Sequence, residues 1–331
     1  MTPSNRPPIV AGLERGIRVA RGDSLFLATM AAFGLAAVLL TGPLALAHPL
    51  EGWSPEAREL IQGLVARKAA QATAGSPRPV AAIDCDNTLI DGDISFATLV
   101  LHAETRSGTG REDAGTVENR VATAYRTYDD LWESGRNVEA CGYLAGLLEG
   151  MTPAEASALG RDALAKAEAM PRCVRTLAAV AGRLPLEMEQ GIRLRKPMLA
   201  LVDYLKAAGW EVFVVSASAE PVVAAVAARH GIDADHVLGV RTVVQNGRLT
   251  GTWLSPVTWR QGKVDALRAR IGRGPSLALG DAWTDFEMLV DAEAAVLIGR
   301  GKADLLAAAR ARGIVVQPRF EGEQVLPPCP Q

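Results

Sequence analysis

Short apolar runs alternate with longer segments of helical periodicity from residue 54 onward. Four runs are nearly free of polar residues, which is the pattern of strands buried on both faces of a parallel sheet. They cover residues 80–83, 210–215, 276–279 and 296–298. Helical patterns cover 54–72, 197–208 and 221–228, and the Asn-Gly pair at 246–247 predicts a tight hairpin turn. Strands separated by helices predict an α/β fold built on a doubly wound parallel sheet.

The stretch between the first two predicted strands differs in pattern. From 94 to 192 it is helical, with a capping box at 152–155 and a polar loop at 107–115 that we expect to be mobile. Ligands of open parallel sheets bind at the carboxyl ends of the strands, and this insertion begins just after such an end. We therefore predict an all-helical cap over an active site. The predicted domains are an N-terminal helix and linker at 48–78, a core at 79–93 and 194–331, and the cap at 94–193.

The N-terminal segment is predicted to lie outside the fold. Residues 25–47 contain no charged side chain, and arginines outnumber acids in the residues before them. Helix-breaking residues at 41–43 and the small residues Ala45 and Ala47 match a secretory signal with a cleavage site before His48. The alternatives are an uncleaved anchor, which would touch the membrane only through residues 25–47, and a buried core helix. A signal or an anchor implies a periplasmic or extracytoplasmic location, with the protein either secreted after cleavage near Ala47 or anchored by one N-terminal helix.

The net charge bears on nucleic-acid partners, and the cysteines bear on disulfide bonds. The formal net charge is -2 over 331 residues, which gives no indication of a nucleic-acid partner. The four cysteines fit no zinc or redox spacing. In an oxidising compartment, Cys141 and Cys173 either form a bridge between two cap helices or pack as small core residues. Cys85 is expected to be free, and so is Cys329 in a disordered tail.

Two aspartates follow the first predicted strand directly. Asp84 and Asp86 stand at the end of a buried run, where ionised side chains are costly to place without a function. One carboxylate can attack phosphorus and form an aspartyl-phosphate, and the other can protonate the leaving oxygen and later activate water. The alternative is an Asp/Asn turn that caps the following helix.

Further polar residues lie beside the other predicted elements. Ser216 follows the second strand, where its hydroxyl and the N–H of Ala217 can hold a phosphoryl oxygen. Lys263 precedes a helical stretch and would neutralise phosphate charge. Asp281 and Asp285 place two acids at the end of the third strand, and such oxygen ligands suit Mg²⁺. The alternative for Ser216 is a helix cap, and the alternative for Lys263 is a solvated surface side chain.

In this order and spacing, these residues resemble the signature of the haloacid dehalogenase superfamily. The resemblance covers about residues 79–318 and implies a Rossmann-like core with Asp84 as the nucleophile and Asp86 as the general acid/base. An acid at position 86 argues against the dehalogenase branch. By the same resemblance, phosphate would be bound by Ser216, Ala217 and Lys263, and Mg²⁺ by Asp84, the Asp86 backbone carbonyl, Asp281 and Asp285.

Two subgroups of that superfamily are similar to parts of the chain. The insertion point of the cap resembles phosphoserine phosphatases, whereas residues 214–221 and 237–240 look closer to phosphorylcholine phosphatase-like members. By similarity, Asp93 would contact the substrate, and a helix N-cap is its alternative. Aromatic cap residues either bind a quaternary ammonium through cation–π contact or pack in the core. They are Phe96, Tyr125, Tyr128, Trp132 and Tyr143.

The expected function is that of an exported, Mg²⁺-dependent phosphomonoesterase. It would hydrolyse a small phosphorylated metabolite through an aspartyl-phosphate, with phosphorylcholine among the candidates. The expected partner is therefore a small-molecule phosphomonoester and not a nucleic acid. The alternatives are a phosphoserine phosphatase, a phosphotransferase that passes the phosphoryl group to an alcohol, and a non-catalytic envelope scaffold.

Overall fold

The computed structural model describes residues 49–105, 116–323 and 325–330. The predicted signal or anchor at 1–47 and the predicted polar loop at 107–115 lie outside the described residues. Within the described ranges, no helix is both long enough and apolar enough to cross a membrane. Every predicted site residue lies inside these ranges, and all of them belong to the unit formed by residues 48–331.

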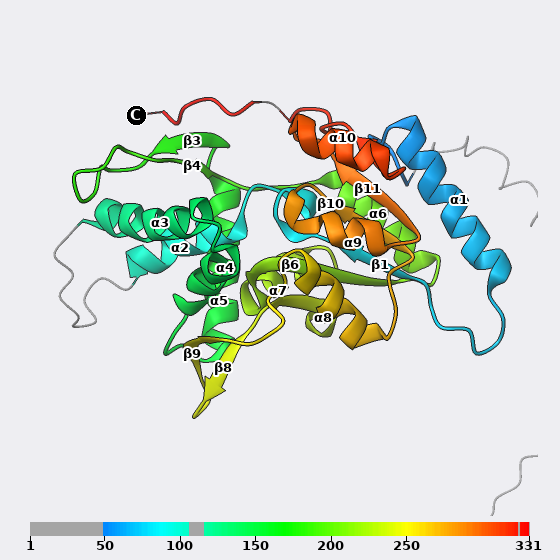
Figure 1. Cartoon of the computed structure of the whole chain (residues 1–331), viewed down its shortest axis with the longest axis horizontal. Helices are drawn as coiled ribbons and strands as arrows, with labels where there is room; N and C mark the ends of the chain where they lie inside the picture. Colours follow the sequence, from blue (N-terminus) through cyan, green and yellow to red (C-terminus); the bar gives the residue numbers. More distant parts are fainter. Residues whose placement is uncertain (1–48, 106–115, 324, 331) are drawn as a thin grey trace, which may run out of the picture. The chain divides into compact units, whose positions relative to one another are not determined.

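A parallel sheet of six strands forms the centre of this unit (Figure 1). Its strands are β1 (Val80–Ile83), β6 (Glu211–Ala219), β7 (Val237–Val240), β10 (Leu277–Gly280), β11 (Ala294–Ile298) and β12 (Val315–Gln317). The order is β12-β11-β10-β1-β6-β7, so later strands flank β1 on both sides. This arrangement confirms the predicted α/β fold. Two strands, β7 and β12, were not predicted, and β6 continues through Ser216 where the prediction ended it.

Helices cover both faces of the sheet. One face carries α1 (Pro55–Gln71), α6 (Lys196–Ala207) and α7 (Glu220–Arg229), and the other carries α8 (Gln261–Ile271), α9 (Phe286–Asp291) and α10 (Ala303–Ala311). Alternate residues of a strand point to opposite faces. Ala81 and Ile83 accordingly pack with the first set, and Val80 and Ala82 with the second. Because both faces are buried, polar side chains on these strands gather at the carboxyl ends, where the site lies.

The segment between β1 and β6 is mostly helical. It contains α2 (Ile94–Thr105), α3 (Val117–Glu133), α4 (Asn137–Gly146) and α5 (Pro153–Ala169). Thr152 and Glu155 form the predicted capping box at the start of α5. The prediction that the cap is all-helical is wrong, because β3 (Cys173–Thr176) and β4 (Glu187–Gln190) pair as an antiparallel hairpin. The β4 sequence has no β-branched residue, so local propensity does not indicate a strand there.

A neck of two short strands joins the cap to the core. β2 (Ile90–Asp91) pairs antiparallel with β5 (Arg193–Leu194), so the chain leaves the core and returns to it at one place. Gly92 follows β2 with a φ of +128°. A Cβ at Gly92 would lie 2.7 Å from the carbonyl oxygen of Gly191, so this position requires glycine.

The predicted hairpin turn at 246–247 joins β8 (Thr242–Gln245) to β9 (Arg248–Trp253). Both Asn246 and Gly247 have positive φ, as a turn of this type requires. The N–H of Gly150 donates to the carbonyl of Leu249 at 2.9 Å, and the N–H of Leu249 donates to the carbonyl of Met151 at 2.7 Å. The hairpin therefore extends from the core segment and bonds to the cap.

Residues 327–329 near the C-terminus pair with the cap, although we predicted a disordered end. The N–H of Val174 on β3 donates to the Pro327 carbonyl at 2.8 Å, and the N–H of Cys329 donates to the Val174 carbonyl at 2.8 Å. Residues 327–329 thus lie along the outer edge of the cap hairpin. The tail is too short and too rich in proline for its sequence alone to indicate this pairing.

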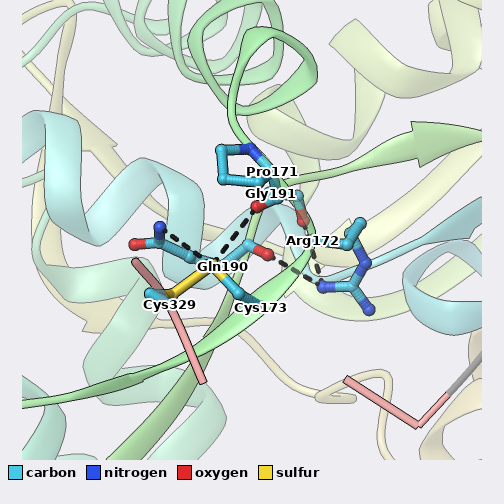
Figure 2. The surroundings of a disulfide bond; sticks show 6 residues. All are labelled: Pro171, Arg172, Cys173, Gln190, Gly191 and Cys329. Atoms are coloured by element: carbon cyan, nitrogen blue, oxygen red, sulfur yellow. Dashed lines mark hydrogen bonds between the residues drawn. A yellow bond between two sulfur atoms is a disulfide. The ribbon is translucent and has the colours of Figure 1, made fainter. Parts of the chain in front are cut away.

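A disulfide joins Cys173 on β3 to Cys329 in the tail (Figure 2). Of the two alternatives for Cys141 and Cys173, a bridge between them is therefore ruled out, and the prediction that Cys329 is free is wrong. Cys141 is free and buried, as is Cys85, which confirms the prediction for Cys85. The error follows from the missed hairpin, since Cys173 lies on a strand at the cap edge and not on a helix.

Candidate active site

The turn after β1 holds Asp84 and Asp86. The N–H of Asp84 donates to the Leu279 carbonyl of β10 at 2.9 Å, which continues the ladder one residue past β1. The chain then forms a π-helical turn, η1 (Cys85–Leu89), in which Asn87 has a φ of +59°. Asparagine tolerates this left-handed conformation better than most residues. The turn aims the two carboxylates at a single cavity, which both of them line.

The end of β6 supplies hydroxyl groups to Asp86. The β6–β7 register is interrupted between Val215 and Ala219, which frees this stretch from regular pairing. The Ser218 hydroxyl donates to Oδ2 of Asp86 at 2.6 Å, and the Ser216 hydroxyl lies 3.4 Å from the same oxygen. The N–H of Ile94 donates to Oδ1 of Asp86 at 2.7 Å. Asp86 is therefore fixed from both oxygens, and Ser218, which the sequence analysis missed, makes the shorter of the two hydroxyl contacts.

Lys263 links Asp84, which follows β1, to Asp285, which follows β10. It lies in the first turn of α8 and is fully buried. Its Nζ donates to Oδ1 of Asp84 and to Oδ1 of Asp285 at 2.6 Å each, and to the Val215 carbonyl at 2.8 Å. Burial alone would lower the pKa of the Lys263 ammonium, but the charges of Asp285 and Asp84 raise it above its ordinary value. Lys263 is therefore a permanent cation beside the candidate nucleophile.

The loop after β10 brings two acids beside Asp84. A Cβ at Gly280 would lie 2.5 Å from the Cβ of Asp285, so the absence of a side chain there lets Asp285 approach the strand. The second oxygen of Asp285 accepts the N–H groups of Asp281 and Ala282 at 3.0 Å each. Because Lys263 occupies its other oxygen, Asp285 orients the loop and the lysine. Asp281 and Asp84 are better placed to hold a cation directly.

Charge balance favours a divalent cation at this point. Carboxylate oxygens of Asp84, Asp281 and Asp285 all lie within 4.8 Å of one another. Lys263 offsets one of these charges, and Arg300, which is partly exposed and 3.4 Å from Asp281, offsets a second one in part. Asp86 adds a further acid to the same cavity. A dense set of buried carboxylate oxygens fits Mg²⁺, which takes one or two protein carboxylates together with waters and a substrate oxygen.

The pKa values of Asp84, Asp86 and Asp281 are all raised in this cluster of buried acids. Burial raises the pKa of the Asp84 carboxyl, and the charge of Asp285 raises it further, against the lowering effect of Lys263. Burial likewise raises the pKa of Asp86, although the Ser218 hydroxyl acts against this. Burial and the charge of Asp285 raise the pKa of Asp281 to about 6. The ionised forms are therefore costly without a cation to balance them.

Aromatic rings of the cap line part of the cavity. The cavity has a volume of about 350 Å³, and Phe96, Tyr125, Tyr128 and Trp132 line one side of it. The Phe96 and Tyr125 rings meet edge to face at 5.0 Å, and the rings of Tyr128 and Trp132 stack at 5.7 Å. Tyr143, the fifth aromatic candidate, is not among the lining residues. The packing interpretation is therefore confirmed for these four rings, which also line the cavity, whereas binding of a quaternary ammonium stays a prediction.

Asp93 serves as a cap and also faces the cavity. Its Oδ1 accepts the N–H of Phe96 at 3.1 Å, which is the helix N-cap interaction weighed in the sequence analysis. It also lines the cavity, beside the aromatic rings. Burial and the charge of Asp86 raise the pKa of Asp93 well above its ordinary value. A cationic ligand group beside it would favour the ionised form.

The structure adds an arginine to this site that the sequence analysis missed. Arg300 follows β11 and lines the cavity, and its guanidinium also pairs with Glu189 of the cap strand β4 at 3.2 Å. Since β11 is parallel to β1, its carboxyl end lies at the same edge of the sheet. That rule, applied to the fourth predicted strand, would have found Arg300. Glu189 has no comparable signal, because its strand was not predicted.

All eight predicted site residues are brought together. Asp84, Asp86, Asp93, Ala217 and Asp281 line the cavity itself. Ser216, Lys263 and Asp285 lie behind this lining and are bonded to it. Four segments far apart in the sequence thus converge at the carboxyl ends of β1, β6 and β10 and at the start of α8.

Comparison with protein-family profiles identifies one family that matches this chain. The profile of the haloacid dehalogenase-like hydrolase family matches residues 81–290. That range contains all eight residues named above. A search of curated proteins finds no match.

Several solved structures are similar to this chain. A conserved protein of unknown function from Anaerococcus prevotii DSM 20548 is 21% identical with a TM-score of 0.61, covering 80% of this chain and 92% of that one. A protein of unknown function from Bordetella pertussis Tohama I is 22% identical with a TM-score of 0.53, covering 73% and 98%. A phosphoserine phosphatase, solved as a phospho-aspartyl intermediate analogue, is 14% identical with a TM-score of 0.43, covering 73% and 93%. That last likeness is too distant to bear on the substrate.

Proposed function

The chain belongs to the haloacid dehalogenase-like hydrolase family, and on that basis we propose that it is a Mg²⁺-dependent phosphomonoesterase acting through an aspartyl-phosphate on Asp84. The observation that carries this proposal is the position of Lys263. Its ammonium lies 2.6 Å from the carboxylate of Asp84, which lines the cavity together with Asp86. A nucleophile, a second carboxylate and a fixed cation are the groups that phosphoryl transfer to a carboxylate needs.

The proposed reaction has two steps. An Asp84 oxygen attacks phosphorus while the bond from phosphorus to the leaving oxygen breaks, and Asp86 gives that oxygen a proton. Asp86, now ionised, then takes a proton from water as the water oxygen attacks the phosphorus of the aspartyl-phosphate, which releases Asp84 and inorganic phosphate. Lys263, the Ser216 hydroxyl and the N–H of Ala217 bind and orient the phosphoryl oxygens. Mg²⁺, held by Asp84, Asp281 and the Asp86 carbonyl, would neutralise phosphoryl charge.

The nucleophile can be tested by one substitution and a matched control. In a screen of small phosphomonoesters with Mg²⁺, Asp84→Asn should lower turnover by roughly several orders of magnitude, because an amide does not attack phosphorus. Asp203→Asn, at an exposed position on α6, should leave turnover unchanged. The mechanism is wrong if Asp84→Asn is folded and turns over normally. The absence of phosphate release from every tested monoester would contradict the function itself.

We propose further that the leaving group carries a positive charge, as in phosphorylcholine. Four aromatic rings and the carboxylate of Asp93 form the cap side of the cavity, a surface that suits a quaternary ammonium. A phosphoserine substrate would also require a partner for its own carboxylate. Arg300 and Lys302 are the cationic side chains that line the cavity, and because the Arg300 guanidinium is already paired with Glu189 and close to Asp281, Lys302 is the candidate for that role.

Tyr128 provides the substrate test. Tyr128→Leu removes a ring from the wall, whereas Tyr128→Phe keeps it. Loss of one cation–π contact of about 0.5–2 kcal/mol should raise KM for phosphorylcholine by roughly 2- to 30-fold in the leucine variant and little in the phenylalanine variant. KM for p-nitrophenyl phosphate, which has no cation, should change little in either. An equal rise for both substrates, or a wild-type preference for phosphoserine, would reject the cationic leaving group.

We also propose that the protein works outside the cytoplasm. The apolar, uncharged pattern of residues 25–47 and the disulfide between Cys173 and Cys329 both support this, because such bonds persist in oxidising compartments. Fractionation of a bacterial host, followed by N-terminal sequencing, tests it. A mature start at His48 would indicate a cleaved signal and retention of Met1 an anchor, whereas recovery only from the cytoplasm would rule out both.

A further inference from the structure

Arg195 holds the turn that carries the candidate nucleophile. It lies between β5 and α6 and is only 4% exposed. Its Nη1 donates to the carbonyls of Asn87, Thr88 and Ile90, which follow Asp84 and Asp86 in the chain. Two carbonyls of the η1 turn and the first carbonyl of β2 therefore depend on a single guanidinium nitrogen. A shift of this guanidinium would remove donors from the backbone that sets the direction of both carboxylates.

The opposite edge of the same guanidinium is held by the C-terminal tail. Nε of Arg195 donates to Oε1 of Glu323 at 2.5 Å, and Nη2 donates to Oε2 at 3.1 Å. The glutamate side chain is 13% exposed, so the pair is largely shielded from solvent. A bidentate pair fixes the plane of a guanidinium as well as its position, which a single contact does not. A buried arginine that lost this partner would remain charged and uncompensated.

The tail segment that carries Glu323 is anchored on both sides. Before it, the Phe320 ring packs edge to face with Trp53 at 5.2 Å, and Arg195 lies over Phe320 at 5.8 Å. After it, Cys329 is bonded to Cys173 of the cap (Figure 2). The glutamate therefore reaches the nucleophile turn from a segment fixed to the core at one end and to the cap at the other.

We propose that Glu323 is a positioning residue, which acts through Arg195 to keep the 84–90 turn in its reactive geometry. Glu323 does not line the cavity and has no part in binding the substrate. Its removal should therefore affect the alignment of Asp84 and leave the substrate pocket in place. The kinetic test of this role rests on the proposed phosphomonoesterase function. The test by hydrogen–deuterium exchange does not depend on that function.

The kinetic test compares two glutamates of the same tail. Glu323→Gln removes the charge that faces Arg195, and Glu321→Gln changes an exposed neighbour. With p-nitrophenyl phosphate as the probe, Glu323→Gln should lower kcat by about 10- to 100-fold, the usual cost of a small misplacement of a reacting group, while KM stays within about twofold. Glu323→Asp keeps the carboxylate and should lose less. A normal kcat, or a loss confined to KM, would overturn the proposal.

Hydrogen–deuterium exchange gives a readout that needs no substrate. In Glu323→Gln, amides of peptides covering 84–94 should exchange faster than in the wild type, while those of β10 stay protected. Glu321→Gln should match the wild type throughout. Unchanged exchange in 84–94 would overturn the positioning role even if no substrate were found. Faster exchange over the whole sheet would also overturn it, because it would mean that Glu323 supports the fold as a whole. If the wild type proved inactive on every phosphomonoester, the proposed function would fail while this measurement still decided the role of Glu323.

Discussion

Lys263 and Asp285 form an ion pair that is closed to solvent on both sides. Their Nζ and Oδ1 atoms are 2.6 Å apart, and neither side chain exposes any surface. Asp84 shares the same ammonium at the same distance. Two carboxylates from different strand ends thus depend on one cation for their charge balance, and stability and chemistry are coupled at this point.

Removing Lys263 should therefore destabilise the fold. In metal-free buffer, Lys263→Met leaves two buried carboxylates without their partner and should lower the free energy of unfolding by about 3–5 kcal/mol, measured by denaturant titration. The double variant Lys263→Met/Asp285→Asn removes one of the stranded charges and should regain part of that loss. Strictly additive losses in the two single variants and the double variant would show that the pair is not coupled.

Magnesium should stabilise the wild type by binding the folded state. The unfolding temperature should rise with Mg²⁺ concentration, because the acids around Asp84 are brought together only on folding. Asp281→Asn should need at least about tenfold more Mg²⁺ for the same rise, whereas Asp265→Asn, at an exposed position on α8, should behave as the wild type. Identical Mg²⁺ dependence in all three proteins would move the metal site elsewhere.

His230 should make stability depend on pH. Its ring is buried, with Nδ1 3.0 Å from the Val226 carbonyl, and burial lowers the pKa of the imidazole below its usual 6.5. The unfolded chain then binds a proton more readily than the folded one, so this contribution is complete above pH 6.5 and is lost as pH falls below it. Unfolding titrations at pH 7.5 and 5.5 should show a smaller difference in His230→Gln than in the wild type. His236→Gln, at a partly exposed position, serves as the control, and equal pH dependence in wild type and His230→Gln would contradict the assignment.

The disulfide should be visible by thiol counting and by its effect on stability. In the unreduced, denatured protein two thiols should react, those of Cys85 and Cys141, and after reduction all four. Closing a loop of 156 residues should stabilise the fold by up to about 5 kcal/mol in the chain-entropy description. Cys329→Ser should lose most of that increment, and a fully reactive set of four thiols before reduction would show that the bond does not form.

The parts of the fold that could be predicted are those with a local signal. Val80 to Ile83 is apolar throughout and is followed by two acids. Both the buried strand and the acidic site residues at its carboxyl end can therefore be predicted from the sequence. The same holds for the strand before Asp281, and the topological rule then places both ends at one edge of the sheet. Lys263 has no such local signal and was found only through its spacing from the other motifs.

The parts that could not be predicted depend on contacts between distant segments. The cap hairpin forms because Val174 and Glu189 pair across a long connection, although β4, which has no β-branched residue, has little intrinsic strand propensity. The tail is ordered by its bond from Cys329 to a strand that was itself missed. Glu323 reads as an ordinary acid of a polar tail, and only its position beside Arg195 distinguishes it. Because the β3–β4 hairpin was not predicted, the ordering of the tail that is bonded to it was not predicted either.

The two-residue neck of β2 and β5 has a consequence for how this protein can diversify. Because the chain departs and returns through one small ladder, the loops between Gly92 and Gly191 can change in length without changing how the strands beneath them are connected, provided that α5 keeps the residues that pack with α7 in the core. New substrates can therefore be acquired by exchanging this module while the acids of the core stay fixed. In this chain, keeping the bond to the tail adds a further condition: a transplanted module must bring a cysteine to meet Cys329. Among relatives, the two cysteines are expected to be inherited or lost as a pair.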